Sequence, residues 1–257
     1  MVRRLLTKEQ MAEELLRVRG QGWIESRRPL NSGGIGNTID HLLGLSENNL
    51  PIADTAEWEL KTHRAGSSSL ITLFHMEPLP RSVVPRQLLP KHGWPDAQDR
   101  LNELSFRQTL VATGFTDRGF QIALDEAQER LRLVFQYAAV QERHRDWLTV
   151  VGQRAGWGPL NPEPHWSVRD VARKVSTKML NSFYVVADTR QTDDGESFRI
   201  TSISILEEFN TDGFLTAVRV GGIYVDFDAR THHNHGTKFR LRKDALPTLY
   251  RYVDEIG

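Results

Sequence analysis

The eight residues Asp54-Thr-Ala-Glu-Trp-Glu-Leu-Lys61 hold three carboxylates and one ammonium. From Glu57 to His63, polar and apolar side chains alternate, and this alternation predicts a strand. Successive side chains of a strand point to opposite faces. The predicted strand therefore has a charged face with Glu57, Glu59 and Lys61 and an apolar face with Trp58 and Leu60. Asp54 lies just before the strand begins.

The charged face has two interpretations. In the first, it is a solvated sheet edge with cross-strand ion pairs. In the second, Asp54 and Glu59 hold Mg²⁺, which takes hard oxygen ligands and keeps several waters, while Lys61 orients or deprotonates the attacking water and offsets charge on phosphorus. The spacing alone does not decide, because a Glu-X-Lys match is expected by chance in a chain with 33 acidic residues among 257.

Composition limits the class of protein. With 257 residues and 39% hydrophobic content, the chain is an ordinary globular protein of one large domain or two lobes. The absence of cysteine excludes disulfides and thiolate zinc sites and favours a reducing compartment. No apolar run reaches the length of a signal-peptide core or a membrane span, so a cytoplasmic location is expected. Lys plus Arg equals Asp plus Glu at 33 each, which does not favour a generic, basic nucleic-acid binder.

Local patterns predict the secondary structure. Apolar residues at helical spacing, with capping residues, predict helices at 7–20, 37–44, 123–148, from the capping box Ser167-Val-Arg-Asp170 onward, and around 246–256. Strand-like runs lie at 57–63 and 69–75, joined as a hairpin, and at 183–188, 198–206, 214–220, 223–229 and 238–242. The proline-rich segment 77–95 is expected to lack regular structure and to mark a lobe boundary.

Several blocks at the beginning of the chain follow one another in a specific order. They are Gly22-Trp-Ile-Glu-Ser-Arg-Arg28, Gly34-Ile-Gly-Asn-Thr-Ile-Asp-His-Leu-Leu-Gly44, Glu47-Asn-Asn-Leu-Pro51, Asp54, Glu59-Leu-Lys-Thr62 and Leu70-Ile-Thr-Leu-Phe74. This series resembles the MvaI/BcnI family of type II restriction endonucleases, whose fold is related to that of the repair nickase MutH. By the resemblance, Asp54 and Glu59 are the metal ligands and Lys61 is the catalytic lysine. The family usually has a glutamate at the position of Asp40.

The resemblance implies a fold and an activity. The fold is the α/β PD-(D/E)XK type, a mixed sheet flanked by helices, with two lobes around a DNA cleft. Residues 1–80 would form the catalytic lobe and 81–257 mainly the recognition lobe, with some segments returning. The activity is Mg²⁺-dependent cleavage of double-stranded DNA at a short CC-S-GG-like or CC-W-GG-like site by a monomer that nicks each strand in turn. A companion DNA methyltransferase is expected in the host. Two alternatives stay open, a MutH-like nickase and a DNA-binding protein with structural carboxylates.

The C-terminal part of the chain concentrates polar side chains on one strand face. Tyr224, Asp226, Asp228 and Arg230 alternate with apolar residues and precede Thr231-His-His-Asn-His-Gly236 and Lys238-Phe-Arg-Leu-Arg242. A zinc site is a poor interpretation because cysteine is absent, and a polar hairpin without further function is a second one. A third is base recognition, in which Arg230 and Arg240 bind guanine and Asp228 accepts from cytosine. The run from Asp226 to Arg240 also resembles the recognition region of the same family.

Further residues are candidates for DNA contacts. His75 and one of His232, His233 or His235 are expected to meet the central base pair of an odd-length site. Lys174 and Lys178 follow the capping box and point away from the apolar face formed by Val168, Val171, Val175 and Met179. They are candidate phosphate contacts, which position the protein without reading sequence. A solvated helix face is the alternative interpretation of these two lysines.

Overall fold

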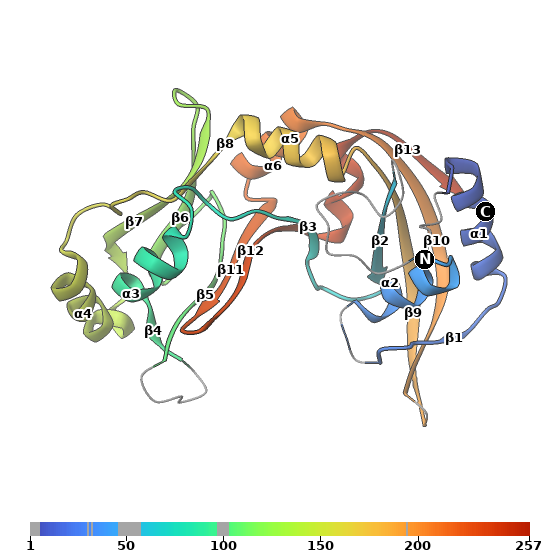
Figure 1. Cartoon of the computed structure of the whole chain (residues 1–257), viewed down its shortest axis with the longest axis horizontal. Helices are drawn as coiled ribbons and strands as arrows, with labels where there is room; N and C mark the ends of the chain where they lie inside the picture. Colours follow the sequence, from blue (N-terminus) through green and yellow to red (C-terminus); the bar gives the residue numbers. More distant parts are fainter. Residues whose placement is uncertain (1–5, 30, 32, 46–57, 97–102, 194) are drawn as a thin grey trace. The chain divides into compact units, whose positions relative to one another are not determined.

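The computed structural model describes residues 6–29, 31, 33–45, 58–96, 103–193 and 195–257. The chain divides into two compact units (Figure 1). The first unit contains Met1–Ile71, Arg173–Gly213 and Arg242–Gly257, and the second contains Thr72–Ala172 and Phe214–Leu241. Among the described residues, no helix combines the length and the apolar character needed to cross a membrane.

A mixed sheet forms the centre of the first unit. Its strands are β1 (Ile24–Glu25), β10 (Gly195–Phe209), β9 (Asn181–Thr192) and β2 (Trp58–Arg64), in that order, and β13 (Tyr250–Ile256) also pairs with β10. β2 runs parallel to β9, while β9, β13 and β1 are antiparallel to β10. The predicted strand that carries Glu59 and Lys61 is therefore present, and it pairs with a segment more than a hundred residues later in the chain.

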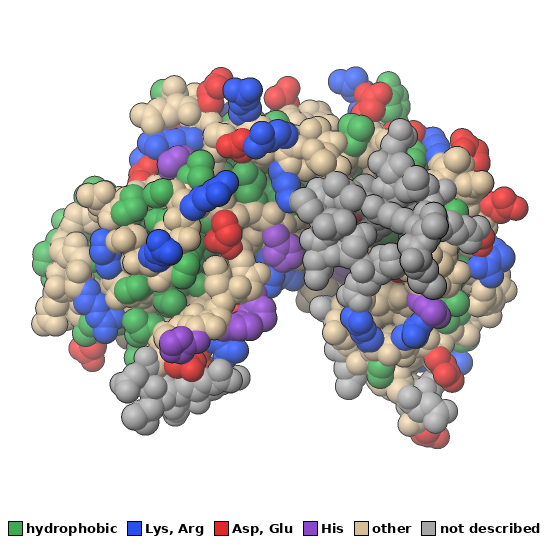
Figure 2. Space-filling view, viewed as in Figure 1, with side chains coloured by type: hydrophobic (Ala, Val, Ile, Leu, Met, Phe, Trp, Pro, Cys, Tyr) green, Lys and Arg blue, Asp and Glu red, His purple; other side chains and the backbone are tan. Residues whose placement is uncertain are grey.

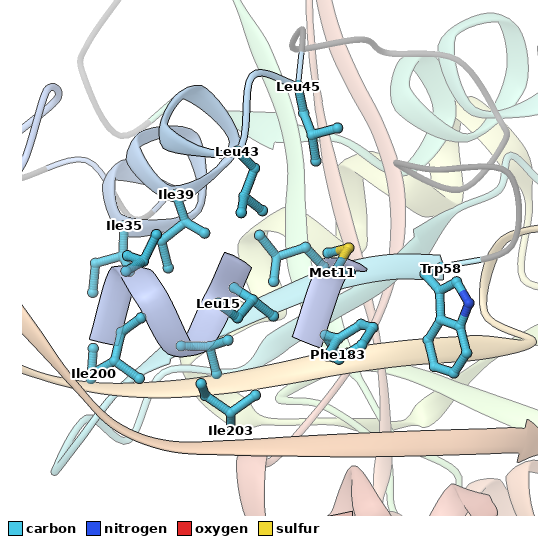
Figure 3. Packing of buried hydrophobic residues seen from close by; sticks show 14 of the residues in the cluster. Met11, Leu15, Ile35, Ile39, Leu43, Leu45, Trp58, Phe183, Ile200 and Ile203 are labelled. Atoms are coloured by element: carbon cyan, nitrogen blue, oxygen red, sulfur yellow. The ribbon is translucent and has the colours of Figure 1, made fainter. Parts of the chain in front are cut away.

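Two helices pack against this sheet. α1 (Lys8–Arg19) begins with the predicted capping box, in which Gln10 N donates to Thr7 Oγ1 and Thr7 N donates to Gln10 Oε1. α2 (Gly34–Leu42) is the predicted short helix. The apolar faces of both helices meet the apolar face of the sheet in one buried cluster (Figure 3), whose members include Met11, Leu15, Ile35, Ile39, Trp58, Leu60, Phe183, Ile200 and Ile203. Burial of Trp58 and Leu60 turns Glu59 and Lys61 to the other face.

Two sheets form the second unit. The larger has the order β3 (Ile71–His75), β12 (His233–Leu241), β11 (Ile223–Arg230), β5 (Leu104–Leu110) and β4 (Trp94–Pro95). The smaller has the order β6 (Arg118–Asp125), β7 (Arg130–Val140) and β8 (His165–Ser167). Aromatic rings fill the interior, and Phe106 makes edge contacts with Phe120 and Phe227 at centroid distances of 5.1 and 5.4 Å. Aromatic pairs favour this geometry.

The remaining elements are short or connect the units. They are η1 (Val84–Leu88), α3 (Leu89–His92), η2 (Glu142–His144), α4 (Arg145–Ala155), α5 (Val168–Lys178), α6 (Thr211–Arg219), η3 (Lys243–Ala245) and η4 (Pro247–Leu249). α5 begins at the second predicted capping box, where Asp170 N donates to Ser167 Oγ at 3.0 Å. Of the predicted apolar face, Val171, Val175 and Met179, which directly follows the helix, are buried, and Val168 is half-buried.

Five expectations about secondary structure are wrong. The predicted hairpin does not form, because β2 pairs with β9 and β3 pairs with β12 in a different sheet. Residues 123–148 are not one helix: β7 has a two-residue alternation with Leu131 and Leu133 buried, and Glu129 turns the chain with φ 46°. The predicted strand 214–220 lies in α6, where Phe214 and Val218 are buried one turn apart.

The other two wrong expectations are those for the C-terminus and for the proline-rich segment. The predicted terminal helix is two 3₁₀ turns followed by β13. Tyr250 to Ile256 pair with β10, which supplies hydrogen-bond partners for the backbone. In the proline-rich segment 77–95, which was expected to be irregular, Pro85 lies at the start of the π-helical η1 and the short helix α3 follows.

Candidate active site

Glu59, the carboxylate of β2, is buried, with 3% of its surface exposed. The neighbouring Trp58 and Leu60 belong to the core on the opposite face. A buried carboxylate is costly unless charges or hydrogen bonds compensate it. The groups around Glu59 must therefore compensate its charge, and a carboxylate oxygen that they do not contact is available to a ligand.

Two lysines share one oxygen of Glu59. Lys61 Nζ lies 2.7 Å from Glu59 Oε1, and Lys178 Nζ lies 3.5 Å from the same atom. The Lys61 and Lys178 side chains are 13% and 22% exposed. Oε2 is buried and makes no hydrogen bond to any residue that the structure describes. The arrangement places two positive charges at one oxygen of the carboxylate and leaves its second oxygen without a hydrogen bond from the described residues.

A third lysine lies near this pair. Lys174 is one helical turn before Lys178 on α5. Burial lowers the pKa of Lys174, and the positive charge of Lys178 lowers it further. The last turn and a half of α5 thus brings two ammonium groups close together, an arrangement that an anion such as a phosphate stabilises.

A neutral hydrogen-bonded pair lies beside Glu59. Ser182 is directly opposite Glu59 in the parallel β2–β9 register, and Ser182 Oγ is 2.8 Å from Tyr250 Oη. Burial raises the pKa of Tyr250 above its ordinary range, and the negative charge of Glu59 adds to the rise against the opposing Ser182 hydrogen bond. The phenol is therefore neutral and close enough to Glu59 to sense its charge.

The donor set at this site suits a hard divalent cation. Glu59 Oε2 is a buried carboxylate oxygen without a hydrogen bond from the described residues, and Mg²⁺ takes such oxygens. Asp40 lies on α2, which packs against β2. Asp54 lies outside the described residues. Within the described ranges, no group of three or more His, Asp and Glu side chains forms a metal-binding cluster, so a complete ligand set would have to include other donors.

The C-terminal candidates lie on two adjacent strands, where acidic and basic groups pair. Arg240 on β12 lies 3.1 Å from Asp226 on β11, and Lys238 lies 3.3 Å from Asp228. Arg107 on β5 is 2.8 Å from the other oxygen of Asp228. Burial acts to raise the pKa of Asp228, but the Lys238 hydrogen bond and the nearby positive charges outweigh it, so the pKa is lowered. Asp228 is therefore ionised, and the ion pairs of Asp226 and Asp228 hold Arg240, Lys238 and Arg107 close to these strands.

The candidate histidines lie at the ends of β3 and β12. His75 ends β3 and is exposed, and His232 occupies the turn after β11 with φ 64°. His233 Nε2 and His235 Nε2 are 2.7 Å apart, so one of them donates to the other. Arg230 is paired in register with His233, and within the described part of the chain no carboxylate forms an ion pair with it. On the face drawn in Figure 2, histidines, basic and acidic side chains are intermixed.

Sequence reasoning missed three residues that the structure brings to these sites. Ser182 and Tyr250 lie beside Glu59, and Arg107 binds Asp228. Tyr250 had been included in a predicted helix, although Tyr-Arg-Tyr-Val has the β-branched and aromatic composition of a strand. Arg107 belongs to β5, a strand that the sequence had not predicted. Lys178 was predicted as a phosphate contact, but its position at Glu59 was not anticipated.

Comparisons with known proteins identify the family. The profile of the MvaI/BcnI restriction endonuclease family matches residues 12–250. The structure of the restriction endonuclease MvaI with its cognate DNA substrate is similar at TM-score 0.79 and 20% identity, covering 98% of this chain and 100% of that chain. The structure of MvaI without DNA is similar at TM-score 0.53 and 20% identity, covering 96% of this chain and 98% of that chain. No curated protein matches by sequence. These structural matches confirm the predicted restriction endonuclease-like α/β fold, and the family profile shows that the chain belongs to the MvaI/BcnI restriction endonuclease family and is a site-specific deoxyribonuclease.

Proposed function

We propose that the chain is a type II restriction endonuclease whose catalytic centre lies on β2 and uses Mg²⁺. The observation that supports this proposal is the state of Glu59. One of its oxygens is shared by two lysines, and the other is buried without a hydrogen bond from the described residues. A structural ion pair would normally leave no such oxygen, because a buried acceptor without a partner is destabilising.

Each residue of the site has a proposed role. Asp54 and Glu59 would hold Mg²⁺, and Asp40 would act through a bound water from α2. When bound, the metal supplies charge stabilisation at the phosphate and a lowered pKa of the attacking water. Lys61 orients that water or accepts its proton and offsets charge that develops on the phosphate oxygens. The 3′ oxygen is the leaving group. The first unit is therefore assigned to catalysis.

We assign sequence recognition to the second unit. Arg240 and Arg230 are the proposed guanine readers, with Asp228 as an acceptor for cytosine N4. Asp226 and Lys238 orient these groups through the ion pairs of β11 and β12. His75 and one of His232, His233 and His235 are assigned to the central pair. The proposed site is pseudopalindromic, with outer CC and GG around a central S or W pair.

The enzyme is proposed to act as a monomer that nicks each strand in turn. One catalytic centre that cuts both antiparallel strands must bind the site in two orientations, so nicked circles precede linear DNA. Lys174 and Lys178 are proposed to contact phosphates and position the duplex. A DNA methyltransferase that modifies the same site is expected in the host, because an unmodified genome would be cleaved.

The experiment that tests the proposal uses supercoiled plasmid that contains CCNGG sites, with Mg²⁺ or with EDTA. Transient nicked circles followed by linear fragments only with Mg²⁺ support it. Stable nicked circles would instead indicate a nickase of the MutH kind. Intact plasmid under all conditions, with DNA binding retained, would contradict the assigned catalytic centre. Sedimentation of the protein on a short cognate duplex tests the monomer, and a stable dimer would contradict it.

A further inference from the structure

Lys178 contacts the same carboxylate oxygen as the proposed catalytic lysine. Its Nζ lies 3.5 Å from Glu59 Oε1, while Lys61 Nζ lies at 2.7 Å. Lys61 reaches Glu59 from two residues along the same strand, whereas Lys178 reaches it from the last turn of α5. The two ion pairs therefore differ in length and in the element that carries the lysine.

These differences determine which lysine can leave Glu59. A cation at Oε2 would be the third positive charge around the Glu59 carboxylate, after Lys61 and Lys178. Because positive charges repel one another, each one weakens the attraction of Glu59 for the other two. The longer pair is the weaker one, and the Lys178 side chain is 22% exposed against 13% for Lys61. A lysine ammonium on a flexible stem can also move to a nearby phosphate without movement of its backbone. Lys178 is thus the partner that a metal ion displaces.

We infer that Lys178 is a positioning residue that holds Glu59 before metal and DNA bind and moves to a DNA phosphate when they do. This inference rests on the proposed function, in which Glu59 is a metal ligand. Its consequence is a coupling between the two ligands. Metal binding frees Lys178 for the phosphate, and the phosphate draws Lys178 away from Glu59, so each ligand raises the affinity for the other.

The coupling predicts opposite effects of one substitution on two affinities. Lys178→Met keeps the length and apolar stem of the side chain but removes its charge. Without DNA, the affinity for a divalent cation should rise about three- to tenfold, because a competing charge has gone from Glu59. DNA affinity should fall, and its salt dependence should weaken by about one phosphate contact. The gain in DNA affinity that the cation produces should shrink.

The test uses Ca²⁺, for which binding without turnover is expected, and duplexes that carry CCNGG with each central base pair. Calorimetry measures Ca²⁺ affinity of the DNA-free protein, and fluorescence anisotropy measures DNA affinity with and without Ca²⁺. The variants are Lys178→Met, Lys178→Arg, Glu59→Gln and Lys174→Met, the last as a control for Ca²⁺ affinity alone because Lys174 is itself a proposed phosphate contact. Lys174 lies one turn away on α5, and no ion pair with Glu59 is formed by it in the described structure. Near-ultraviolet circular dichroism verifies that each variant is folded.

The expected result is a rise in Ca²⁺ affinity in Lys178→Met but not in Lys174→Met or Lys178→Arg, with a reduced effect of Ca²⁺ on DNA affinity. If Glu59→Gln retains the full Ca²⁺ affinity, the proposed metal site on β2 is wrong. If Glu59→Gln loses Ca²⁺ binding while folded Lys178→Met binds Ca²⁺ no more tightly than the unmodified protein, the metal site stands and the role of Lys178 is wrong.

Discussion

Glu59 and Ser182 lie opposite each other across the parallel β2–β9 pair, and Ser182 Oγ is 2.8 Å from the buried Tyr250 Oη. The proposed metal ligand is therefore bordered by charged lysines and by a neutral hydroxyl pair. Two strands that are distant in sequence, β9 and β13, supply that pair. Because buried side chains with fixed partners have few alternative rotamers, Ser182 and Tyr250 restrict where the Glu59 carboxylate can lie.

Removal of the Tyr250 hydroxyl should slow cleavage more than it weakens DNA binding. Tyr250→Phe leaves the Ser182 hydroxyl without its buried partner, which costs about 1 kcal/mol of stability, and loosens the packing beside Glu59. We expect a roughly tenfold lower single-turnover rate, in line with the sensitivity of catalysis to small displacements. Tyr252→Phe is the control, because Tyr252 lies on the same strand and is 53% exposed. Equal rates for the two variants would show that Tyr250 has no positioning role.

Substitution of the two central charges on β2 should abolish cleavage while DNA binding remains measurable. Lys61→Ala and Glu59→Gln remove groups that we assign to the chemical step, so we expect the cleavage rate to fall by at least about a hundredfold. DNA binding by the same variants is measured separately, in the presence of Ca²⁺. Lys8→Ala is a matched control, because Lys8 forms an ion pair of the same 2.7 Å length with Glu207 in the same unit. A Lys61→Ala protein that cleaves at a substantial rate would remove Lys61 from the mechanism.

The charge on Asp226 should matter for recognition of one outer base pair. Asp226 holds the Arg240 guanidinium at 3.1 Å, and a guanidinium reads guanine only in a fixed orientation. Asp226→Asn keeps the shape but loses the ionic contact. We expect discrimination at that outer pair to fall about tenfold, measured as kcat/KM on duplexes with one altered outer pair. Asp188→Asn, which loses a more exposed ion pair of similar length (3.0 Å) with Arg199, is the control. Unchanged discrimination would exclude Arg240 as a reader that Asp226 orients.

The part of the candidate active site that the sequence alone places together is the part that one strand carries. Alternation around Glu59 fixes which side chains share a face, and burial of Trp58 and Leu60 confirms it. The positions of Lys178 and Tyr250 depend on pairing between β2, β9, β10 and β13, which local patterns do not determine. From the sequence, Lys178 can be predicted as a basic residue and Tyr250 as an aromatic residue, at the surface or in the core. Neither can be predicted as a neighbour of Glu59.

The wrong prediction of a helix at residues 123–148 has a different cause. Ala127, Leu131, Phe135 and Ala138 happen to recur at helical spacing, while Leu131 and Leu133 also alternate as in a strand. Tertiary pairing of β7 with β6 and β8 selected the second pattern. Similarly, the Asp228 site was predicted only in part, because Arg107 comes from a strand whose pairing with β11 brings it into contact.

His92 should make the second unit sensitive to acid. It is 5% exposed, it packs against the rings of Phe120 and Phe135, and burial lowers its pKa to about 4, with a further contribution from Lys91. The unfolded chain has the ordinary value near 6.5, so between these values the unfolded state binds more protons. The stability is therefore fully present above pH 6.5 and decreases as pH falls toward 4.

The size of this effect is on the order of 2–3 kcal/mol in the free energy of unfolding. Urea unfolding at several pH values between 7 and 4 measures it. His92→Leu has no titrating group at this position, so the free energy of unfolding should change less between pH 6.5 and 4 in this variant. His41→Gln, which replaces an exposed histidine, should not reduce this change. If the slope between pH 6.5 and 4 is the same in His92→Leu and in the unmodified protein, His92 is not its source.

The candidate histidines at the ends of β3 and β12 are assigned to the central base pair of the target. A monomer that cuts both strands binds an odd-length site in two orientations and meets its central pair both ways round. A neutral imidazole has one donor and one acceptor nitrogen, and the tautomers exchange these roles. His75 at the end of β3 can therefore donate to guanine or accept from cytosine, with His232, His233 or His235 facing the partner base. The mutual hydrogen bond of His233 and His235 already requires one donor and one acceptor nitrogen.

We therefore expect preference for a central G·C or C·G pair over A·T or T·A, because the thymine methyl group and the donor–acceptor pattern of adenine do not match this arrangement. Cleavage rates on four duplexes that differ only in the central pair measure the preference. His75→Ala should reduce it by about tenfold, the size expected for loss of one base contact, while discrimination at the outer pairs is retained. Equal cleavage of all four duplexes by the unmodified protein would contradict the histidine assignment, and a preference for A·T and T·A would assign the chain a W-centred site.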